Sequence, residues 1–286
     1  MIHLVIIFSI LIAAYSLLLL KYYIGWIYLH PDPSPLNRPK NELPFISVLI
    51  AARNEEHNLQ KLFRCFMQQD YPRDLFEVIV IDDHSEDETA RVIHEWEKST
   101  DFNLRSFRNK QDQTGKKAAL KNGLKEAKGQ LILQTDADCV MKKEWITTHV
   151  DYYLKNNPSL VLAPVRLIPQ KYFNKWLQIF ENAALLVSTA GSLNFKKPIM
   201  ANGANMMFKK DTVVSITDPY NDKVVSGDDI FLTLHAVKQN GQKVKFLKSA
   251  NACVETFAKS SWKEIIQQRQ RWVQKSSQYT DPHIII

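Results

Sequence analysis

Two stretches decide the fold: Phe76–Asp83, which reads FEVIVIDD, and Leu131–Asp138, which reads LILQTDAD. Each is a short apolar run that ends in two aspartates, adjacent in the first and one residue apart in the second. Runs of this length between polar segments are typical of strands buried on both faces of a parallel sheet. Ligands bind beyond the carboxyl ends of such strands, so the sequence predicts acidic side chains at the open edge of an α/β sheet.

Short apolar runs and amphipathic segments alternate around these two stretches. Short loops connect them, and this order is typical of a doubly wound, mostly parallel sheet flanked by helices. The predicted strands are Ile46–Ala51, Phe76–Ile81, Asn103–Phe107 and Leu131–Gln134, and the predicted helices are Glu55–Gln69, Asp87–Trp96 and Lys116–Lys128, the last closed by Gly129.

The alternation becomes less regular after Asp138. Longer amphipathic segments predict helices here, and an irregular stretch surrounds Asn202–Asn205. The predicted helices are Lys143–Lys155, Tyr172–Ala190, Asp229–Lys238 and Trp262–Ser276, the predicted strands are Leu160–Pro164, Val244–Leu247 and Ala252–Glu255, and Ile199–Phe208 is left irregular.

The N-terminal segment predicts a transmembrane helix. Leu4–Leu20 carries no charge, and Tyr22–Leu29 is again apolar and aromatic. About 17–25 apolar residues at roughly 1.5 Å each span a hydrocarbon core of about 30 Å. A signal peptide and a buried core helix are the alternatives. The segment lacks the basic start and small-residue cleavage site of a signal peptide, and Lys21 and the length disfavour a core helix.

The flanking charges predict the orientation of this helix. Lys21, Arg38 and Lys40 follow it, and no Lys or Arg precedes Leu4. The positive-inside rule therefore places the rest of the chain in the cytoplasm, as a single-pass protein of the cell membrane. Pro31–Pro35 predicts a stiff, extended linker. Four aromatic residues, Tyr22, Tyr23, Trp26 and Tyr28, are expected to form an interfacial belt.

Composition narrows the possible partners. Among 286 residues, 37 Lys and Arg exceed 30 Asp and Glu, which gives a net charge of +7. Such a surplus suits an anionic partner: a nucleic acid, an acidic membrane leaflet or a phosphorylated substrate. The three cysteines are far apart and form no CxxC pair, which disfavours a disulfide framework and a zinc site. No GxGxxG follows the first strand, so a dinucleotide oxidoreductase is not expected.

The clustered aspartates predict a metal site. Carboxylates in one crevice repel each other and need a positive counter-charge. A divalent cation shared with phosphate oxygens supplies it, since magnesium is often held by one or two carboxylates plus substrate phosphates. We therefore expect Asp82, Asp83, Asp136 and Asp138 to lie near a metal-bound phosphate. Solvated turns are the alternative reading of such acidic pairs.

With these motifs in order, the chain resembles family 2 glycosyltransferases of the GT-A fold, including cellulose, chitin, hyaluronan and poly-N-acetylglucosamine synthase-like enzymes with a QxxRW motif. The resemblance covers Pro44 to Trp272. It rests on Ser47–Glu56, Val80–Thr89, Gly115–Leu120, Thr135–Asp138, Ser226–Asp229 and Gln268–Trp272.

This resemblance implies a UDP-sugar donor bound in the first half of the domain. Ala51, Arg53 and Glu55 would hold the nucleotide, and either Asp82 or Asp83 would accept the imide N–H of uracil. Lys116 would touch the nucleotide as well. Simpler roles remain open: Asp82 could cap the following helix, Glu55 could complement a helix dipole, and Lys116 could be solvated.

The same resemblance assigns Asp138, and with it Asp136, to Mg²⁺ or Mn²⁺ that bridges the two phosphates of the donor. Asp136 would also contact the nucleotide-sugar. The metal would neutralise the charge that builds as the sugar leaves.

Further motifs imply an acceptor site in the second half. Asp229 would be the catalytic base of an inverting displacement, with Asp228 supporting the loop. Asn202 and Gly203 would line the acceptor site. Gln268, Arg271 and Trp272 share one helix face, where Arg suits pyrophosphate and Trp suits a sugar ring. A helix that simply docks on the core through Trp272 is the alternative.

The predicted organisation is a transmembrane helix over residues 1–29, a linker over 30–44 and a GT-A domain over 45–286. Residues 45–140 would bind the nucleotide and residues 141–286 the acceptor, which would be a saccharide or a lipid-linked sugar. Relatives with QxxRW often continue into further membrane helices, and little follows Trp272 here. We therefore expect a shortened chain, a partner subunit in the membrane or a lipid-linked acceptor, and no processive synthesis by this chain alone.

Two other functions remain open: an inactive binding or scaffold protein on the same fold, and a nucleotidyltransferase, which also needs acids and a metal. Much of the positive charge can serve the anionic leaflet and the donor phosphates. We therefore expect no nucleic-acid partner.

Overall fold

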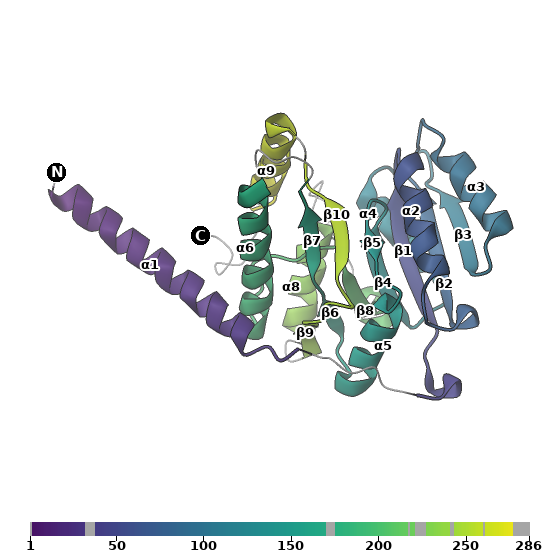
Figure 1. The fold of residues 1–286 in the computed structure, drawn as a ribbon, viewed down its shortest axis with the longest axis horizontal. Coiled ribbons are helices and arrows are strands. Elements are labelled where there is room, and N and C mark those ends of the chain that lie inside the picture. The colour runs from purple at the N-terminus through teal and green to yellow at the C-terminus, as the bar shows by residue number, and fades with distance from the viewer. Residues whose placement is uncertain are drawn as a thin grey trace.

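The structure is a computed structural model that describes residues 2–31, 38–169, 175–216, 218–220, 227–240, 243–259 and 261–276, with side chains of the last helix described as far as Gln270. An α/β body carries one long N-terminal helix that projects away from it (Figure 1). The fold class predicted from the sequence is confirmed: a central, mostly parallel sheet lies between layers of helices.

The main sheet has seven strands in the described part of the chain, in the order β3-β2-β1-β4-β8-β6-β9. Strands β3, β2, β1 and β4 run parallel, β8 is antiparallel to both of its neighbours, and β6 and β9 run parallel. Their bounds are β1 Ile46–Ala52, β2 Phe76–Asp82, β3 Asn103–Arg108, β4 Leu131–Asp136, β6 Leu160–Leu162, β8 Met206–Lys209 and β9 Val244–Phe246.

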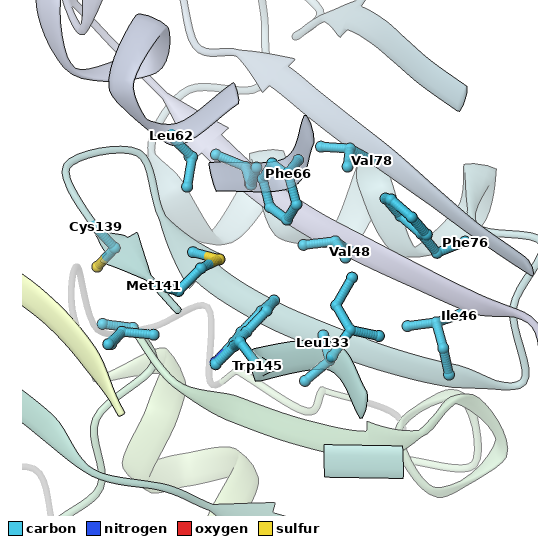
Figure 2. Packing of buried hydrophobic residues seen from close by; sticks show 14 of the residues in the cluster. Ile46, Val48, Leu62, Phe66, Phe76, Val78, Leu133, Cys139, Met141 and Trp145 are labelled. Carbon is cyan, nitrogen blue, oxygen red and sulfur yellow. The ribbon is translucent and has the colours of Figure 1, made fainter. Parts of the chain in front are cut away.

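Alternate residues of each strand enter the cores on opposite faces of the sheet. Val48 and Ile50 belong to one core and Leu49 to the other, as the period of two in a strand requires. The first core is covered by α2 (Glu56–Met67), α3 (Thr89–Ser99) and α5 (Trp145–Asn156), and the second by α4 (Lys116–Glu126), α6 (Lys175–Asn194) and α8 (Asp228–Asn240). Figure 2 shows Phe66 and Trp145 packed between Val48 and Met141 in the first core.

A small second sheet extends this body. It has the order β5-β10-β7, with β10 antiparallel to β5 and parallel to β7. Because β5 follows the acidic end of β4, this sheet brings the C-terminal part of the chain to the aspartates. The bounds are β5 Val140–Met141, β7 Val165–Ile168 and β10 Val254–Phe257, and the remaining helices are α7 Lys210–Val214, α9 Trp262–Ser276 and the short 3-10 turns η1 Lys40–Glu42 and η2 Arg73–Leu75.

Several predicted boundaries were wrong. Helix α4 ends at Glu126, where Ala127 donates its N–H to the carbonyl of Gly123, so Gly129 does not close it. A glycine is needed at position 129 for a different reason: a β carbon at Gly129 would lie 2.6 Å from the backbone nitrogen of Ser47.

In the second half of the chain, the predicted elements differ more from those of the structure. Strand β7 was missed because it is four residues long and follows directly on Pro164, and β10 begins at Val254 rather than Ala252. Helix α6 runs from Lys175 to Asn194, past the predicted end at Ala190, and the predicted start at Tyr172 lies outside the described residues.

Helix α1 (Ile2–Ile27) is the one helix in the described ranges that is long and apolar enough to cross a membrane, and its most apolar window is not buried in the body. Near its C-terminal end, Tyr22 and Gly25 pack on α6. Trp26 lies edge-on to Phe246. The predicted four-residue aromatic belt is therefore wrong for Tyr22 and Trp26, which contact protein, and only Tyr23 and Tyr28 of the four are exposed.

Candidate functional site

Two adjoining hollows open at the carboxyl ends of the parallel strands. The first, which we call the strand-end hollow, has a volume of about 350 Å³ and is lined by residues between Ala51 and Asp138. The second, the helix-lined hollow, has a volume of about 420 Å³ and receives residues from α6, α8, β10 and α9. Lys116, Asp136 and Asp138 belong to the walls of both. The predicted residues of the strand-end hollow are Ala51, Arg53, Glu55 and Asp83, and those of the helix-lined hollow are Asn202, Gly203, Asp228, Asp229 and Gln268.

Asp83 is fixed at the base of the strand-end hollow. Both of its carboxylate oxygens accept the N–H of Gly115, at 2.8 and 2.9 Å, and Asn109 donates its side-chain amide to one of them at 2.8 Å. Gly115 has a φ of +96°, which an L side chain rarely adopts. A glycine is therefore required where the chain turns its N–H toward this carboxylate, and Lys116 follows at the start of α4.

Asp82 lies next to Asp83, but its carboxylate bonds to the loop that follows β2. One of its oxygens accepts the N–H of Ser85 at 3.0 Å, and Arg108 lies 4.0 Å away. It is absent from the described walls of both hollows. It does not cap the following helix either, because α3 begins at Thr89 and the carboxylate of Asp87 accepts the Thr89 N–H. Of the two aspartates, Asp83 is the one that faces the hollow.

Hydrogen bonds join the loops that follow β1 and β2. The N–H of Asn54 donates to Ser85 at 3.0 Å, and the N–H of Glu55 donates to the Thr89 hydroxyl at 2.7 Å. These contacts hold the loop from which Glu55 lines the strand-end hollow. Burial raises the pKa of Glu55; a hydrogen bond from Asn58 opposes this rise, and the charge of Asp138 adds to it. Arg53 is exposed at the rim.

Lys116 connects the two halves of the site. Its Nζ lies 2.6 Å from an oxygen of Asp136 and 3.8 Å from an oxygen of Asp228. Burial alone would lower the pKa of Lys116, but the carboxylates of Asp136 and Asp228 outweigh it and raise the pKa above the usual value. The anion that contacts this lysine at the helix start is thus supplied by the protein itself.

Asp138 is positioned by a strand from the far end of the chain. The hydroxyl of Thr256, in β10, donates to one of its oxygens at 3.0 Å. Burial and the nearby charge of Asp136 raise the pKa of Asp138, whereas the Thr256 hydrogen bond opposes that rise.

The donor set fits a hard cation that takes part of its coordination from a bound molecule. Asp136 and Asp138 offer carboxylate oxygens, the ligands that Mg²⁺ and Mn²⁺ prefer. Within the described ranges, no group of three His, Cys, Asp or Glu side chains could hold a metal ion. A cation at Asp136 and Asp138 could take further oxygens from a ligand such as a diphosphate.

Asp229 is held at the start of α8 beside the loop 202–205. Gly203 donates its N–H to one carboxylate oxygen at 3.3 Å, and Ile230 donates to the other at 2.8 Å. A β carbon at Gly203 would lie 2.8 Å from the amide nitrogen of Gln134, so a larger residue here would displace that side chain. Gln134 in turn donates to the Gly203 carbonyl at 3.1 Å. Asn202 accepts the N–H of Ala204 and closes the turn.

The QxxRW motif is only partly described. Gln268 in α9 belongs to the wall of the helix-lined hollow. Arg271 and Trp272 lie in the same helix, but their side chains fall outside the described part, so their roles stay predictions.

Several wall residues were missed by sequence reasoning. Thr256 and Lys259 lie in the wall of the helix-lined hollow, together with apolar side chains of α6, β7, β9 and β10. Gln134 is not among the described wall residues but contacts the loop at Gly203. Each belongs to no motif and lies far along the chain from the residue it contacts. Strand β10 reads Val254-Glu255-Thr256-Phe257 and does not alternate between polar and apolar residues, so no local signal placed Thr256 at the site. The apolar wall includes Val165, Leu167, Leu185, Leu186, Phe246 and Phe257.

Comparison with known proteins identifies the family. The sequence profile described as "Glycosyl transferase family 2" matches residues 47–214, more than half of the chain. The chain belongs to glycosyl transferase family 2.

Individual relatives are distant. Glycosyltransferase AglE from Haloferax volcanii is 26% identical over 215 residues, which cover 74% of this chain and 67% of that protein. A beta-monoglucosyldiacylglycerol synthase from Trichormus variabilis is 33% identical over 122 residues, covering 43% of this chain and 26% of the relative. Across curated relatives such as these, the chain spans between 26% and 70% of their length.

Solved structures confirm the fold. The mannosyltransferase PcManGT from Pyrobaculum calidifontis, solved in complex with GDP-Man and Mn²⁺, superposes with a TM-score of 0.72 at 19% sequence identity, over 97% of this chain and 78% of that one. At this identity the likeness establishes the GT-A-type α/β architecture of this family 2 member and not its ligands.

Proposed function

We propose that this family 2 protein is a metal-dependent, inverting glycosyltransferase that transfers a sugar from a nucleoside-diphosphate sugar, a UDP-sugar foremost, to a hydroxyl of a saccharide or lipid-linked acceptor. The observation that carries the proposal is that Lys116, Asp136 and Asp138 line both hollows. A donor in the strand-end hollow would thus present its sugar to the helix-lined hollow. The GDP-Man and Mn²⁺ bound to the mannosyltransferase support this reading.

The donor's base would pair with Asp83. Gly115 and Asn109 hold its carboxylate as an acceptor-only group facing the hollow, which suits the imide N–H of uracil. Arg53 and Glu55 would contact the rest of the nucleotide from the loop after β1. Asp82, which bonds to Ser85, would keep that loop in place rather than bind the base.

The donor's diphosphate would lie at Asp138 and Asp136. When bound there, Mg²⁺ or Mn²⁺ neutralises the negative charge that develops on the departing nucleoside diphosphate. Lys116 would add positive charge from the other side of Asp136. Gln268, Arg271 and Trp272 would close the site from α9, with Arg271 as a paired donor for phosphate.

Asp229 would act as the base. It takes the proton from the acceptor hydroxyl while that oxygen bonds to C1 of the sugar and the C1–O bond to the diphosphate breaks. One displacement of this kind inverts the anomeric centre and releases the nucleoside diphosphate. Gly203 and Ile230 hold the carboxylate through their N–H groups, which fixes its direction without protonating it. Asn202, Gly203 and Asp228 would shape the acceptor site.

We also propose that α1 anchors the protein in the cell membrane with the catalytic domain in the cytoplasm. Its length and composition support a spanning helix, and Lys21, Arg38 and Lys40 on its C-terminal side support the orientation. The name of the Trichormus relative refers to a glycosylated diacylglycerol, which makes a lipid-linked acceptor a reasonable partner to test. A membrane partner subunit remains part of the proposal.

The test is turnover by the full chain in native membranes, with a panel of nucleotide sugars and Mg²⁺ or Mn²⁺. We expect release of a nucleoside diphosphate, with the Asp229→Asn variant slower by about 10²–10⁴-fold because the general base is lost. Asp211→Asn, a change at an exposed aspartate of α7, is the matched control and should keep full activity.

Three outcomes contradict the proposal. Release of pyrophosphate would indicate a nucleotidyltransferase. Binding of a nucleotide sugar without turnover under any condition would favour a scaffold protein. Unchanged turnover in Asp229→Asn would remove that residue from the chemistry.

A further inference from the structure

A further pocket lies apart from the two hollows of the candidate site. It has a volume of about 440 Å³, within the range of roughly 300–1,000 Å³ that is usual for ligand pockets. Its walls come from the end of α1, from β7 and β10, and from the turn that joins β9 to β10. None of its described wall residues lines either hollow, so we treat it as a separate feature and call it the rear pocket.

The small sheet separates the rear pocket from the helix-lined hollow. In β7, Val165 and Leu167 line the hollow, whereas Arg166 between them lines the rear pocket. In β10, Thr256 lines the hollow and its neighbour Glu255 lines the rear pocket. Successive side chains of a strand point to opposite faces of a sheet. The rear pocket therefore lies on the face of the small sheet that is turned away from the helix-lined hollow.

Positive side chains predominate in the wall of the rear pocket. Its described residues include three cations, Lys142, Arg166 and Lys248, but a single carboxylate, that of Glu255. Arg166 forms an ion pair with Glu255, which is its partner in the parallel register of β7 and β10. Two positive charges of the described wall are thus left without a balancing carboxylate in that wall.

Lys248 is held against the end of α1. Its Nζ donates to the Trp26 carbonyl at 2.9 Å and lies 4.1 Å from the centre of the Trp26 ring. Both of these partners are uncharged, and an ammonium group has three N–H donors. The contacts with Trp26 therefore fix the position of the ammonium without neutralising its charge.

Lys142 enters the pocket from the segment that follows β5. Its Nζ donates to the side-chain oxygen of Asn251 at 3.3 Å, which is again an uncharged partner. The half-buried thiol of Cys253 lies among these charges. Burial raises the pKa of Cys253, the charges of Arg166 and Lys142 oppose that rise, and the charge of Glu255 adds to it. Cations from separate segments of the chain therefore converge around one point of the wall.

We propose that the rear pocket is a binding site for a phosphate group, held by the guanidinium of Arg166 and the ammonium groups of Lys142 and Lys248. A phosphate monoester carries a charge of about −1.5 to −2 at neutral pH, which matches the two unbalanced charges of the wall. Arg166 would present its planar donors to the phosphate oxygens, and the two lysines would add point charges from the other strands and turns.

The molecule that carries the phosphate has room beside it in the pocket. Trp26, Pro31 and Pro164 provide an apolar part of the wall against which such a group can pack. The headgroup of an anionic phospholipid and a phosphorylated molecule in solution both have this chemistry. The inference goes beyond the proposed transfer reaction and does not rest on it.

The experiment uses Cys253 to report on occupancy of the rear pocket. The full chain in micelles of an uncharged detergent is treated with iodoacetamide, and mass spectrometry gives the rate of alkylation of each cysteine. Inorganic phosphate is titrated against chloride at matched ionic strength. Cys65 is the internal reference, because it is also half-buried but does not line the described wall. Thermal unfolding confirms that each variant is folded.

We expect phosphate to slow the alkylation of Cys253 several-fold and to leave that of Cys65 unchanged. Arg166→Gln and Lys142→Gln should each need about tenfold more phosphate for half-protection, because each removes a charge-assisted hydrogen bond. Lys98→Gln is the matched control, since it removes one positive charge from an exposed position of α3 and should behave as the parent. Lack of protection of Cys253, equal protection of Cys65, or unchanged protection in both pocket variants overturns the inference.

Two further arms of the experiment identify the source of the phosphate. The first replaces inorganic phosphate with glycerol 3-phosphate. The second places the chain in phosphatidylcholine vesicles with or without a small fraction of phosphatidic acid, in the absence of free phosphate. Protection by phosphatidic acid that is weakened in Arg166→Gln supports a lipid headgroup, and protection confined to the dissolved phosphates supports a soluble ligand. Equal protection by phosphatidylcholine alone overturns the inference, because the membrane then covers the thiol without recognising an anionic phosphate. Turnover of nucleotide sugars is measured separately, so the transferase proposal holds or fails independently.

Discussion

The two hollows differ in how the chain builds them. Every described residue that lines the strand-end hollow lies between Ala51 and Asp138, at the ends of neighbouring parallel strands and the turns that follow them. The helix-lined hollow takes its walls from Lys116 to Gln268, across both sheets and four helices. The first is a local product of strand order, and the second is assembled by long-range packing.

The difference also concerns what holds the carboxylates. Asp83 is fixed by the N–H of Gly115 and the amide of Asn109, both within the same half of the chain. Asp138 depends on Thr256, 118 residues away in sequence. Substitutions in the strand-end hollow should therefore act on donor binding alone, whereas those at the shared wall should act on both substrates.

The largest effect should come from the shared wall. Asp138→Asn removes a charge that both hollows use, and we expect kcat/KM to fall by about 10²–10³-fold, the size typical for loss of one electrostatic stabiliser. UDP binding should also lose its dependence on Mn²⁺, as measured by calorimetry with and without the metal. Asp211→Asn is the control. A variant that binds UDP with unchanged dependence on Mn²⁺ would show that Asp138 is not a metal ligand.

A smaller effect should separate Asp82, the last residue of β2, from Asp83, which follows it. Asp83→Asn replaces an acceptor-only group by an amide, and we expect UDP to bind about 10–100-fold more weakly, since hydrogen bonds to charged groups contribute about 1.5–3 kcal/mol. Asp82→Asn is the matched comparison. It should lower thermal stability through the Ser85 contact more than it changes UDP affinity. The reverse pattern, in which Asp82→Asn loses UDP and Asp83→Asn keeps it, would assign the base to Asp82.

The smallest effect, on Mn²⁺-dependent UDP affinity, should appear only at acidic pH. The pKa of Asp138 is already raised by burial and by Asp136, and Thr256→Val removes the hydrogen bond that opposes this rise. The pKa should therefore rise further, and the protonated carboxyl binds a cation poorly. We expect Mn²⁺-dependent UDP affinity to fall a few-fold in weakly acidic buffer and to match the parent in alkaline buffer, where Asp138 is ionised in both.

The control for this effect is Thr212→Val, a threonine of α7 that does not line the described hollows. An equal loss of affinity at every pH in Thr256→Val would indicate a change of shape rather than of protonation.

Much of the structure of the first half of the domain could be predicted from local sequence patterns. The buried runs ending in Asp82-Asp83 and Asp136-x-Asp138 predicted parallel strands, and the structure places these two strands on either side of β1, with their carboxyl ends at the same edge of the sheet. The sequence could not tell Asp82 from Asp83, because consecutive residues at a strand end face opposite directions and only the loop contacts decide which one turns inward. It also missed that Lys116 pairs with Asp136 and Asp228, since that requires the first residues of α4 and α8, far apart in the chain, to meet at the end of β4.

By itself, the sequence determined the alternation of strands and helices, the acidic strand ends, the apolar N-terminal helix and the motifs of the family. These follow from periodicity and side-chain chemistry, which act over a few neighbouring residues. Only the tertiary structure decided that Thr256 orients Asp138, that Gly203 abuts Gln134 and Asp229, and that α1 crosses α6 at Gly25 and Gly191. These contacts join residues far apart in the chain, and the packing of whole elements sets them, so no local pattern encodes them.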